Sequence, residues 1–287
     1  MLMQKIPIDI THLQTWIDRS ESAQDVATLA PLKALSATLD REDEIDVGDA
    51  IAPGWHWLYF LPLHRQSSLG SDGHAKRGGF LPPVPLPRRM WAGSHMEFHA
   101  SIRAGQTLQR TSKILDVRLK EGRTGPLVFV NVQHQIHAEG ELAITERHDI
   151  VYRDLPTAGE AVPQGIVAPE HADWQREIHP DDVLLFRYSA LTFNGHRIHY
   201  DRRYVTEVEG YPGLIVHGPL IATLLLDLLR RELPSARVKS FGFRAMQPVF
   251  DIAPFKVCAQ QAGPSDVKLW AQTNEGQMAM DAFATIE

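Results

Sequence analysis

Cysteine is almost absent from the sequence, with Cys258 as the one thiol among 287 residues. A single thiol excludes an intramolecular disulfide and any zinc site built from several cysteines. A chain of this size without disulfides is typical of a reducing compartment. We therefore expect a cytoplasmic protein.

Long apolar runs and an excess of basic residues are also lacking. The longest apolar stretch, PLIATLLL, ends at Asp227, far short of the ~20 residues that a membrane-spanning helix needs. The opening segment, MLMQKIPIDITHLQTW, has no uninterrupted apolar core of a signal peptide. The 29 Lys and Arg residues against 35 Asp and Glu residues give a net charge of −6. We expect neither nucleic acid nor membrane as a partner.

The first half of the chain combines a helical pattern with a series of strands. Apolar residues recur at three-to-four spacing over residues 9–40, which predicts helix with a possible break near Pro31. Residues 69–91 are rich in Gly and Pro, and such long irregular loops often cover binding sites. Alternating, β-branched segments between Gly93 and Tyr152 predict an antiparallel meander.

The second half repeats this order. The segment VLLFRYSALTF predicts a strand or a strand leading into a turn, residues 218–233 predict a strongly apolar helix, and strands follow. The segments FHASIRAGQ and FRAMQPVFD share a phenylalanine, a basic residue and an alanine, and each precedes a run of strands. The repeated order predicts a duplicated α+β unit in which an antiparallel sheet wraps a helix. We place the first unit at residues 1–155, a linker at 156–174 and the second unit at 175–287.

Polar, titratable side chains crowd the segment NGHRIHYD, just before the apolar helix. His196 and His199 are three residues apart, and in a helix both would project from one side together with Arg203. An ordinary solvated turn is the alternative, but apolar neighbours such as Ile198 and the flexible Gly195 argue against it. Histidine is the usual general acid or base near neutral pH, so this segment is a candidate acid–base site.

A second candidate lies where the apolar helix begins, at His217, Gly218 and Pro219. Proline in the first turn is normal for a helix start, and taken alone these residues fit that ordinary role. A glycine there also lets a ligand approach the exposed backbone N–H groups, aided by the helix dipole. Beside the histidine pair, this helix start can bind a carbonyl oxygen that becomes negative during a reaction.

The segments FRYSALTFNGHRIHYDRRY and GYPGLIVHGPL resemble the hydratase signature of MaoC-like enzymes with the hotdog fold, which act on enoyl- and hydroxyacyl-thioesters. The segments TFNGHRIHYD, GFLPPVPLPRRMWAGSHMEF and EGRTGPLVFVNVQH are similar to the branch of hydroxyacyl-thioester dehydratase type 2, mesaconyl-C4-CoA hydratase and itaconyl-CoA hydratase. This resemblance spans most of the chain. It implies a double hotdog, in which two antiparallel sheets each wrap a central helix, with a degenerate first unit and the catalytic motif in the second.

The family signature is Asp-x-Asn-Pro-Leu-His, and it assigns roles to residues of this chain. Asn194 stands at the aspartate, His196 at the asparagine, Arg197 at the proline and His199 at the catalytic histidine. Gly218 matches the glycine whose N–H forms the oxyanion hole. Asn194 departs from the family, because an amide does not exchange a proton as a carboxylate does. His199 must therefore carry most of the acid–base work.

The resemblance implies reversible hydration of an α,β-unsaturated acyl-CoA, most naturally a short dicarboxylic one, with no cofactor beyond the CoA thioester itself. His199 would take a proton from the attacking water, Asn194 would position that water, and the Gly218 N–H would stabilise the enolate-like oxygen. A carboxylate on the substrate favours arginine as its partner. The candidate substrate-binding residues are Arg88, Arg89, Arg187, Arg197, His196 and His217.

Other functions stay open. A 3-hydroxyacyl-thioester dehydratase of fatty acid synthesis, a hotdog thioesterase that uses Asp201 or Glu207, and a non-catalytic acyl-CoA-binding protein all fit the same resemblance. His196, His199 and Asp201 are close in sequence, but Asp201 would point elsewhere on a helix and no HExxH pattern is present. We therefore expect no metal. Two hotdog units can pair within one chain, and a homodimer is also compatible with the sequence.

Overall fold

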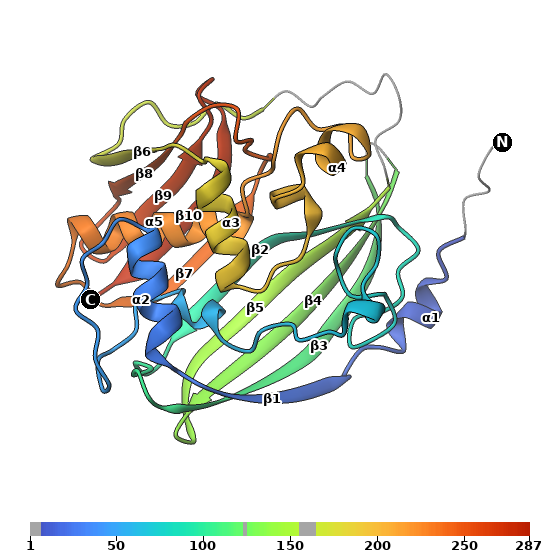
Figure 1. Ribbon diagram of the computed structural model, residues 1–287, viewed down its shortest axis with the longest axis horizontal. Coiled ribbons are helices and arrows are strands. Elements are labelled where there is room, and N and C mark those ends of the chain that lie inside the picture. Colours follow the sequence, from blue (N-terminus) through green and yellow to red (C-terminus); the bar gives the residue numbers. More distant parts are fainter. Residues whose placement is uncertain (1–6, 123–124, 155–164) are drawn as a thin grey trace.

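An antiparallel sheet runs through both halves of the chain (Figure 1). The computed structural model describes residues 7–122, 125–154 and 165–287. Within them, a 10-stranded sheet has the order β1-β3-β4-β5-β2-β7-β10-β9-β8-β6. The strands are β1 (Ser20–Val26), β2 (Arg88–Phe98), β3 (Thr107–Gly122), β4 (Gly125–Ala138), β5 (Glu141–Arg153), β6 (Trp174–Ile178), β7 (Val238–Ala245), β8 (Phe255–Gln261), β9 (Asp266–Gln272) and β10 (Met278–Ile286).

The two halves of the sheet have the same topology. In each half the strands lie in the order first, third, fourth, fifth and second, so β1-β3-β4-β5-β2 is matched by β6-β8-β9-β10-β7. The halves join where β2 pairs with β7, with Gly93 opposite Arg244 and Glu97 opposite Ser240. This repeated topology confirms the predicted duplicated unit and its α+β class.

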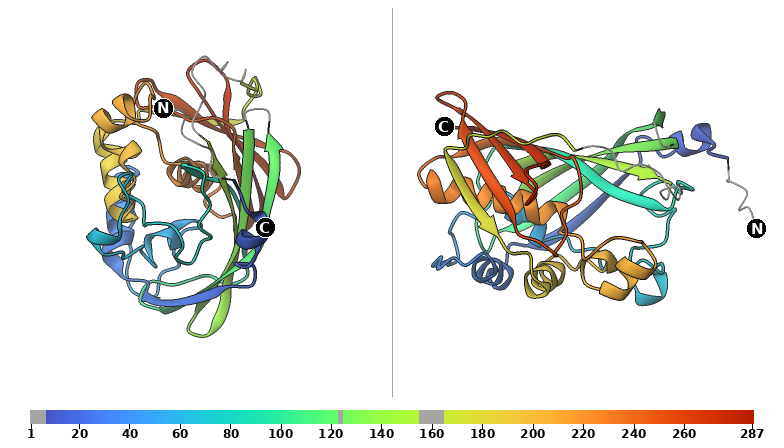
Figure 2. Two further views of the ribbon diagram at one scale, coloured as in Figure 1. Left: turned by 90° about the vertical axis from the view of Figure 1, so that its right-hand side faces the viewer. Right: turned by 90° about the horizontal axis from the view of Figure 1, so that it is seen from above.

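The helices lie on one side of this sheet in two layers. The central helix, α5 (Gly218–Glu232), packs against β6, β8 and β9. Helices α2 (Leu29–Thr38) and α3 (Asp182–Leu191) contact each other and form an outer layer, so that α5 lies between them and the sheet (Figure 2). The remaining helical elements are α1 (Ile10–Gln14), α4 (Arg202–Glu207) and the 3₁₀ turns η1 (Trp55–Leu58), η2 (Gln66–Ser68) and η3 (Arg197–His199).

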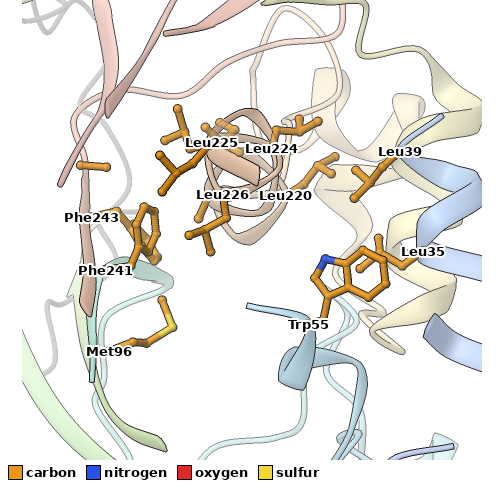
Figure 3. Packing of buried hydrophobic residues seen from close by; sticks show 14 of the residues in the cluster. Leu35, Leu39, Trp55, Met96, Leu220, Leu224, Leu225, Leu226, Phe241 and Phe243 are labelled. Carbon is orange, nitrogen blue, oxygen red and sulfur yellow. The ribbon is translucent and has the colours of Figure 1, made fainter. Parts of the chain in front are cut away.

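Apolar packing around α5 joins the two halves into one core. Ten of the 15 residues of α5 are buried, which is why the helix is apolar on nearly every side. Figure 3 shows its leucines between Phe241 and Phe243 of β7 and the outer helix α2, with Trp55 and Met96 contributed by the first half. A fixed core at this point holds the N-terminus of α5 steady relative to both halves.

Between β1 and β2 the first half has α2 and the short 3₁₀ turns η1 and η2, whereas the second half has the 15-residue α5 just before β7. Gly54 has a positive φ of 83°, and this left-handed conformation changes the direction of the chain just before η1. Pro53 and Pro62 flank the aromatic segment between them and disfavour a longer helix. That the first unit is degenerate in function stays a prediction of the family resemblance.

A buried polar cluster lies beneath η1. Glu146 of β5 is only 2% exposed, and its carboxylate accepts hydrogen bonds from Ser94 Oγ at 2.8 Å, Trp57 Nε1 at 3.1 Å and His56 Nε2 at 3.1 Å. His148 Nε2 lies 2.8 Å from Oε1 of the same carboxylate. Burial alone would raise the pKa of Glu146, but the neighbouring His148 and His56 outweigh it and hold the pKa well below its usual range. The buried carboxylate of Glu146 is therefore negatively charged, and the donors around it stabilise that charge.

Several sequence predictions are wrong in detail. Residues 9–40 are not one helix, because Ser20–Val26 pairs with β3 as an edge strand between α1 and α2. The segment VLLFRYSALTF belongs to α3, which Asp181 caps by accepting a hydrogen bond from Leu184 N at 2.8 Å. The outer face of α3 carries Phe186, which is 63% exposed. This apolar side chain on the solvent side interrupts the alternation of apolar and polar residues from which a helix is predicted. The strand segments that the sequence predicts after Gly93 and after Val238 are confirmed.

Two further points concern the chain as a whole. The predicted linker at residues 156–174 lies partly outside the described residues, and the unit boundaries stay predictions. In the part that is described, Ile166 O accepts a hydrogen bond from Met278 N at 2.7 Å, and β6 begins at Trp174. None of the helices in the described ranges has the length and apolar character needed to cross a membrane.

Candidate active site

His199 is the buried centre of the predicted motif. It ends the short turn η3, is 8% exposed, and places its Nδ1 2.6 Å from Ile215 O. A carbonyl oxygen only accepts, so Nδ1 carries the proton of the neutral ring and Nε2 keeps a free lone pair. Burial lowers the pKa of His199 to about 4, partly opposed by this backbone hydrogen bond. At neutral pH the ring is therefore an uncharged base.

The N-terminus of α5 lies directly beside this ring. His217, the N-cap residue, stacks on His199 with 3.7 Å between ring centroids and 18° between planes. Gly218 follows it as the first helical residue, where backbone N–H groups lack partners within the helix. A Cβ added to Gly218 would meet no other segment within 4 Å, so the space beside this helix start is open. The structure thus brings together the predicted base and the predicted oxyanion-binding N–H.

His217 itself is enclosed in protein. It is 0% exposed, and its Nε2 lies 2.8 Å from Ser189 Oγ on α3. Burial holds the pKa of His217 well below its usual range, with His199 and His196 lowering it further. In this position His217 packs against the ring of His199 and restricts it, and the predicted substrate-binding role of His217 stays a prediction.

Asn194 shapes the turn that leads to His199. Its Oδ1 accepts a hydrogen bond from His196 N at 3.0 Å, and the preceding Phe193 has a positive φ of 49°. The amide NH₂ of Asn194 is left as a donor, which suits the orientation of a water or an oxygen but not proton transfer. The ring of His196 meets His199 edge-on at 5.5 Å, and burial lowers the pKa of His196 to about 2.

A loop from the first half docks onto this motif. The backbone N–H of Arg197 donates to Asp72 O at 2.9 Å, and Arg197 Nη1 donates to Ser71 O at 3.0 Å. Gly73 faces Gly195 so closely that a Cβ on Gly73 would lie 1.8 Å from Gly195 O. Gly73 also has a positive φ of 89°, so glycine is required there both by conformation and by space.

This loop adds two functional candidates that sequence analysis missed, Asp72 and His74. Asp72 Oδ2 accepts a hydrogen bond from His74 Nδ1 at 3.0 Å, and the His74 ring lies 3.9 Å from the ring of His196. The His74 hydrogen bond holds the pKa of Asp72 well below its usual range. Burial lowers the pKa of His74, and the Asp72 carboxylate opposes that shift. In the sequence, the local signal that could have pointed to Asp72 and His74 is the Asp-Gly-His spacing within a glycine-rich loop.

The four candidate arginines have different environments. Arg88 and Arg89 belong to β2 and not to the loop in which the sequence placed them. Arg88 is held by Glu209, with Nη2 3.2 Å from its backbone O, and stacks over Tyr211 at 4.8 Å. Arg197 is held by Asp201 at 2.8 Å, and Arg187 is exposed on α3.

Arg89 is the candidate arginine whose positive charge acts on the histidines. It bonds to Tyr152, where it offsets part of the rise that burial causes in the tyrosine pKa. After burial, the positive charge of Arg89 is among the causes that lower the pKa of His74 and of His196. Its guanidinium therefore lies within electrostatic reach of the site.

The carboxylates proposed for a thioesterase or a metal site have other partners in the structure. Asp201 caps α4 by accepting from Tyr204 N at 3.0 Å, so it does not join His196 and His199 in a ligand set. Glu207 pairs with Arg203 at 2.9 Å on α4, and Arg203 therefore does not project beside the histidines as predicted. Within the described ranges, the group whose ligand atoms could share an ion is Asp72, His74 and His196, all within 4.8 Å of one another.

Comparisons with known proteins cover the loop and the motif described above. The family model for hydroxyacyl-thioester dehydratase type 2 matches residues 54–251, which include both the loop and the motif. The chain is 47% identical over 269 residues to mesaconyl-C(4)-CoA hydratase of Chloroflexus aurantiacus, covering 93% of this chain and 95% of that protein.

Solved structures match the fold over nearly the whole chain. A MaoC-like dehydratase from Phytophthora capsici superposes with a TM-score of 0.69 at 17% identity, covering 97% of this chain and 99% of that chain. A conserved hypothetical protein of Mycobacterium tuberculosis, described as having a double hotdog fold, gives a TM-score of 0.59 at 13% identity, covering 94% and 96%. The predicted double hotdog fold is confirmed.

Proposed function

The chain belongs to the hydroxyacyl-thioester dehydratase type 2 family, and we propose that it adds water reversibly to a short α,β-unsaturated acyl-CoA. The observation that carries the proposal is the stacking of His199 on the N-cap of α5, beside the open space at Gly218. A general base and a charge-stabilising helix start are the two elements that hydration of a conjugated thioester requires.

In the proposed reaction, His199 Nε2 takes a proton from the attacking water as the water oxygen bonds to Cβ. The electron pair of the double bond moves toward the thioester oxygen, where the Gly218 N–H and the helix dipole stabilise the developing negative charge. The Asn194 amide NH₂ orients the water. The same groups acting in reverse perform dehydration of a 3-hydroxyacyl thioester.

We further propose a short dicarboxylic acyl group, as in the name of the Chloroflexus relative. Arg89 is the arginine best placed to meet the free carboxylate, because Arg88 and Arg197 already hold Glu209 and Asp201. Replacing Arg89 with Ala should lower kcat/KM for a carboxylated substrate by about 10–100-fold relative to crotonyl-CoA, the effect of losing one charge-assisted hydrogen bond. Arg187→Ala, on the exposed face of α3, is the matched control. An unchanged preference in Arg89→Ala would rule out this anchor.

The function itself is tested by following the absorbance of a conjugated CoA ester of the crotonyl, mesaconyl or itaconyl type. The wild type should bleach the enoyl absorbance, and His199→Ala should abolish the bleaching. His179→Ala, which removes a histidine that pairs with Glu177 on the surface, should behave as the wild type. Release of free thiol would identify a thioesterase instead, and binding without turnover would identify an acyl-CoA-binding protein.

A further inference from the structure

Hydration requires proton transfer at two atoms, the attacking oxygen and Cα. His199 is placed to serve the oxygen, and Asn194 has no proton to exchange. The proposed reaction therefore assigns no residue to donate the proton to Cα. The structure holds three more histidines beside His199, and their partners differ.

Of these imidazoles, His74 is the one with an anionic partner. His199 contacts the carbonyl of Ile215, and His217 contacts the hydroxyl of Ser189. His74 alone donates its Nδ1 proton to a carboxylate, that of Asp72 at 3.0 Å. A carboxylate in this position fixes the tautomer and stabilises the imidazolium that forms when Nε2 takes up a proton. His74 is thus the ring of the set best able to carry a proton.

We propose that His74, oriented by Asp72, is the second proton-transfer residue of the hydration reaction and serves Cα. This inference rests on the proposed function. In hydration, His199 takes a proton from the water that bonds to Cβ, and the electron pair held on the thioester oxygen then returns, re-forming the C=O bond, to make the Cα–H bond with the Nε2 proton of the His74 imidazolium. His199 then releases its proton to solvent and His74 takes one up, so the cycle balances. In dehydration both transfers reverse.

The placement of His74 supports this assignment. The loop backbone contacts the catalytic turn directly, through Asp72 O with Arg197 N and through Gly73 with Gly195. The His74 ring lies 3.9 Å from His196, which in turn contacts His199. About a quarter of the His74 side chain is exposed, which leaves it a route for exchanging protons with water.

The same three residues, Asp72, His74 and His196, have the spacing of a cation site. Two positive side chains oppose an ion there, since Arg89 and Arg77 both lie close enough to lower the pKa of His74 in addition to the effect of burial. Asp72 already accepts the His74 proton, so binding a metal through His74 Nδ1 would also remove that hydrogen bond. The Asp72–His74 hydrogen bond therefore favours a proton carrier over a metal ligand.

The test compares His74→Gln, Asp72→Asn and His64→Gln with the wild type, using the same enoyl-CoA assay. His74→Gln should lower kcat by about 10²–10⁴-fold, the usual contribution of a general acid or base. It should also remove one limb of the pH profile of kcat. Asp72→Asn keeps a hydrogen-bond partner without the charge and should lower kcat by a smaller factor. His64, exposed in the segment just before η2, is the matched control and should show no change.

A second substitution distinguishes a role of His74 in proton transfer from a purely structural role. Adding Asn194→Asp to His74→Gln supplies a new ionisable group beside His196 and should restore kcat at least about tenfold. A purely structural role of His74 would give a loss with an unchanged pH profile and no rescue, and would overturn the inference. So would wild-type activity that chelation removes and zinc restores, since a metal site would then explain the cluster.

The two proposals fail differently. If the wild type hydrates the substrate, His199→Ala is inactive and His74→Gln is as active as the wild type, only the role of His74 is lost. If the wild type hydrates none of the enoyl-CoA esters, the proposed function itself is wrong.

Discussion

Replacement of Gly73 with alanine tests whether docking of the first-half loop is needed for activity. An added Cβ would lie 1.8 Å from Gly195 O, whereas real Cβ contacts are essentially never under 3.0 Å. The two backbone segments must therefore separate by about 1.2 Å, and His74 moves with its neighbour away from His196. A misplacement of about 1 Å can cost about 100-fold in rate. We expect kcat of Gly73→Ala to fall by about that factor although no catalytic side chain is changed.

Gly78→Ala is the matched control, because it has the same conformational cost without the clash. Both glycines have a φ of 89°, a backbone region that costs an L-residue about 1–2 kcal/mol. A Cβ on Gly78 would meet only Pro83 Cβ, at an ordinary 3.8 Å. Gly73→Ala should therefore lose at least as much stability as Gly78→Ala in thermal unfolding, and of the two only Gly73→Ala should lose activity. Equal activity in the two variants, with melting temperatures lowered alike, would refute the claim that this contact assembles the site.

Two further predictions concern stability. Glu146→Gln should lower the free energy of unfolding by about 3–5 kcal/mol, because the buried amide lacks the carboxylate charge and turns its NH₂ group toward donors that the carboxylate accepts from. Glu97→Gln, at a half-exposed side chain on β2, should change the free energy of unfolding by less than about 0.5 kcal/mol in denaturant titrations. A small loss in Glu146→Gln would show that the cluster is not ionised. Lowering the pH from 7 to 5 should also destabilise the fold. Burial depresses the folded-state pKa of His134, His196, His199 and His217 below the ordinary 6.5. Stability is then complete above pH 6.5 and is lost as the unfolded chain takes up protons below it, by roughly 2 kcal/mol at pH 5 for each ring that stays neutral. Unfolding energies that do not change over this range would contradict the assigned charge states.

Local patterns in the sequence were sufficient for most of the fold. The alternation in β3, β4 and β5 and the apolar run of α5 each depend on residues that are neighbours along the chain, so their periods are visible without tertiary information. The errors lie where tertiary contacts override local preference. Ser20–Val26 becomes a strand because β3 offers an unpaired edge, and α3 is a helix although Phe186 puts an apolar side chain on its outer face.

One part of the candidate site could likewise be predicted from local sequence patterns, and the other part could not. His199 and Gly218 could be found from sequence, since each belongs to a short motif whose meaning lies in its own spacing. The contribution of Asp72 and His74 could not, because the loop and the motif are 126 residues apart between Ser71 and Arg197, and only folding brings them together. No local period encodes a contact of that kind. It exists only in the folded structure, where the loop backbone packs against Gly195.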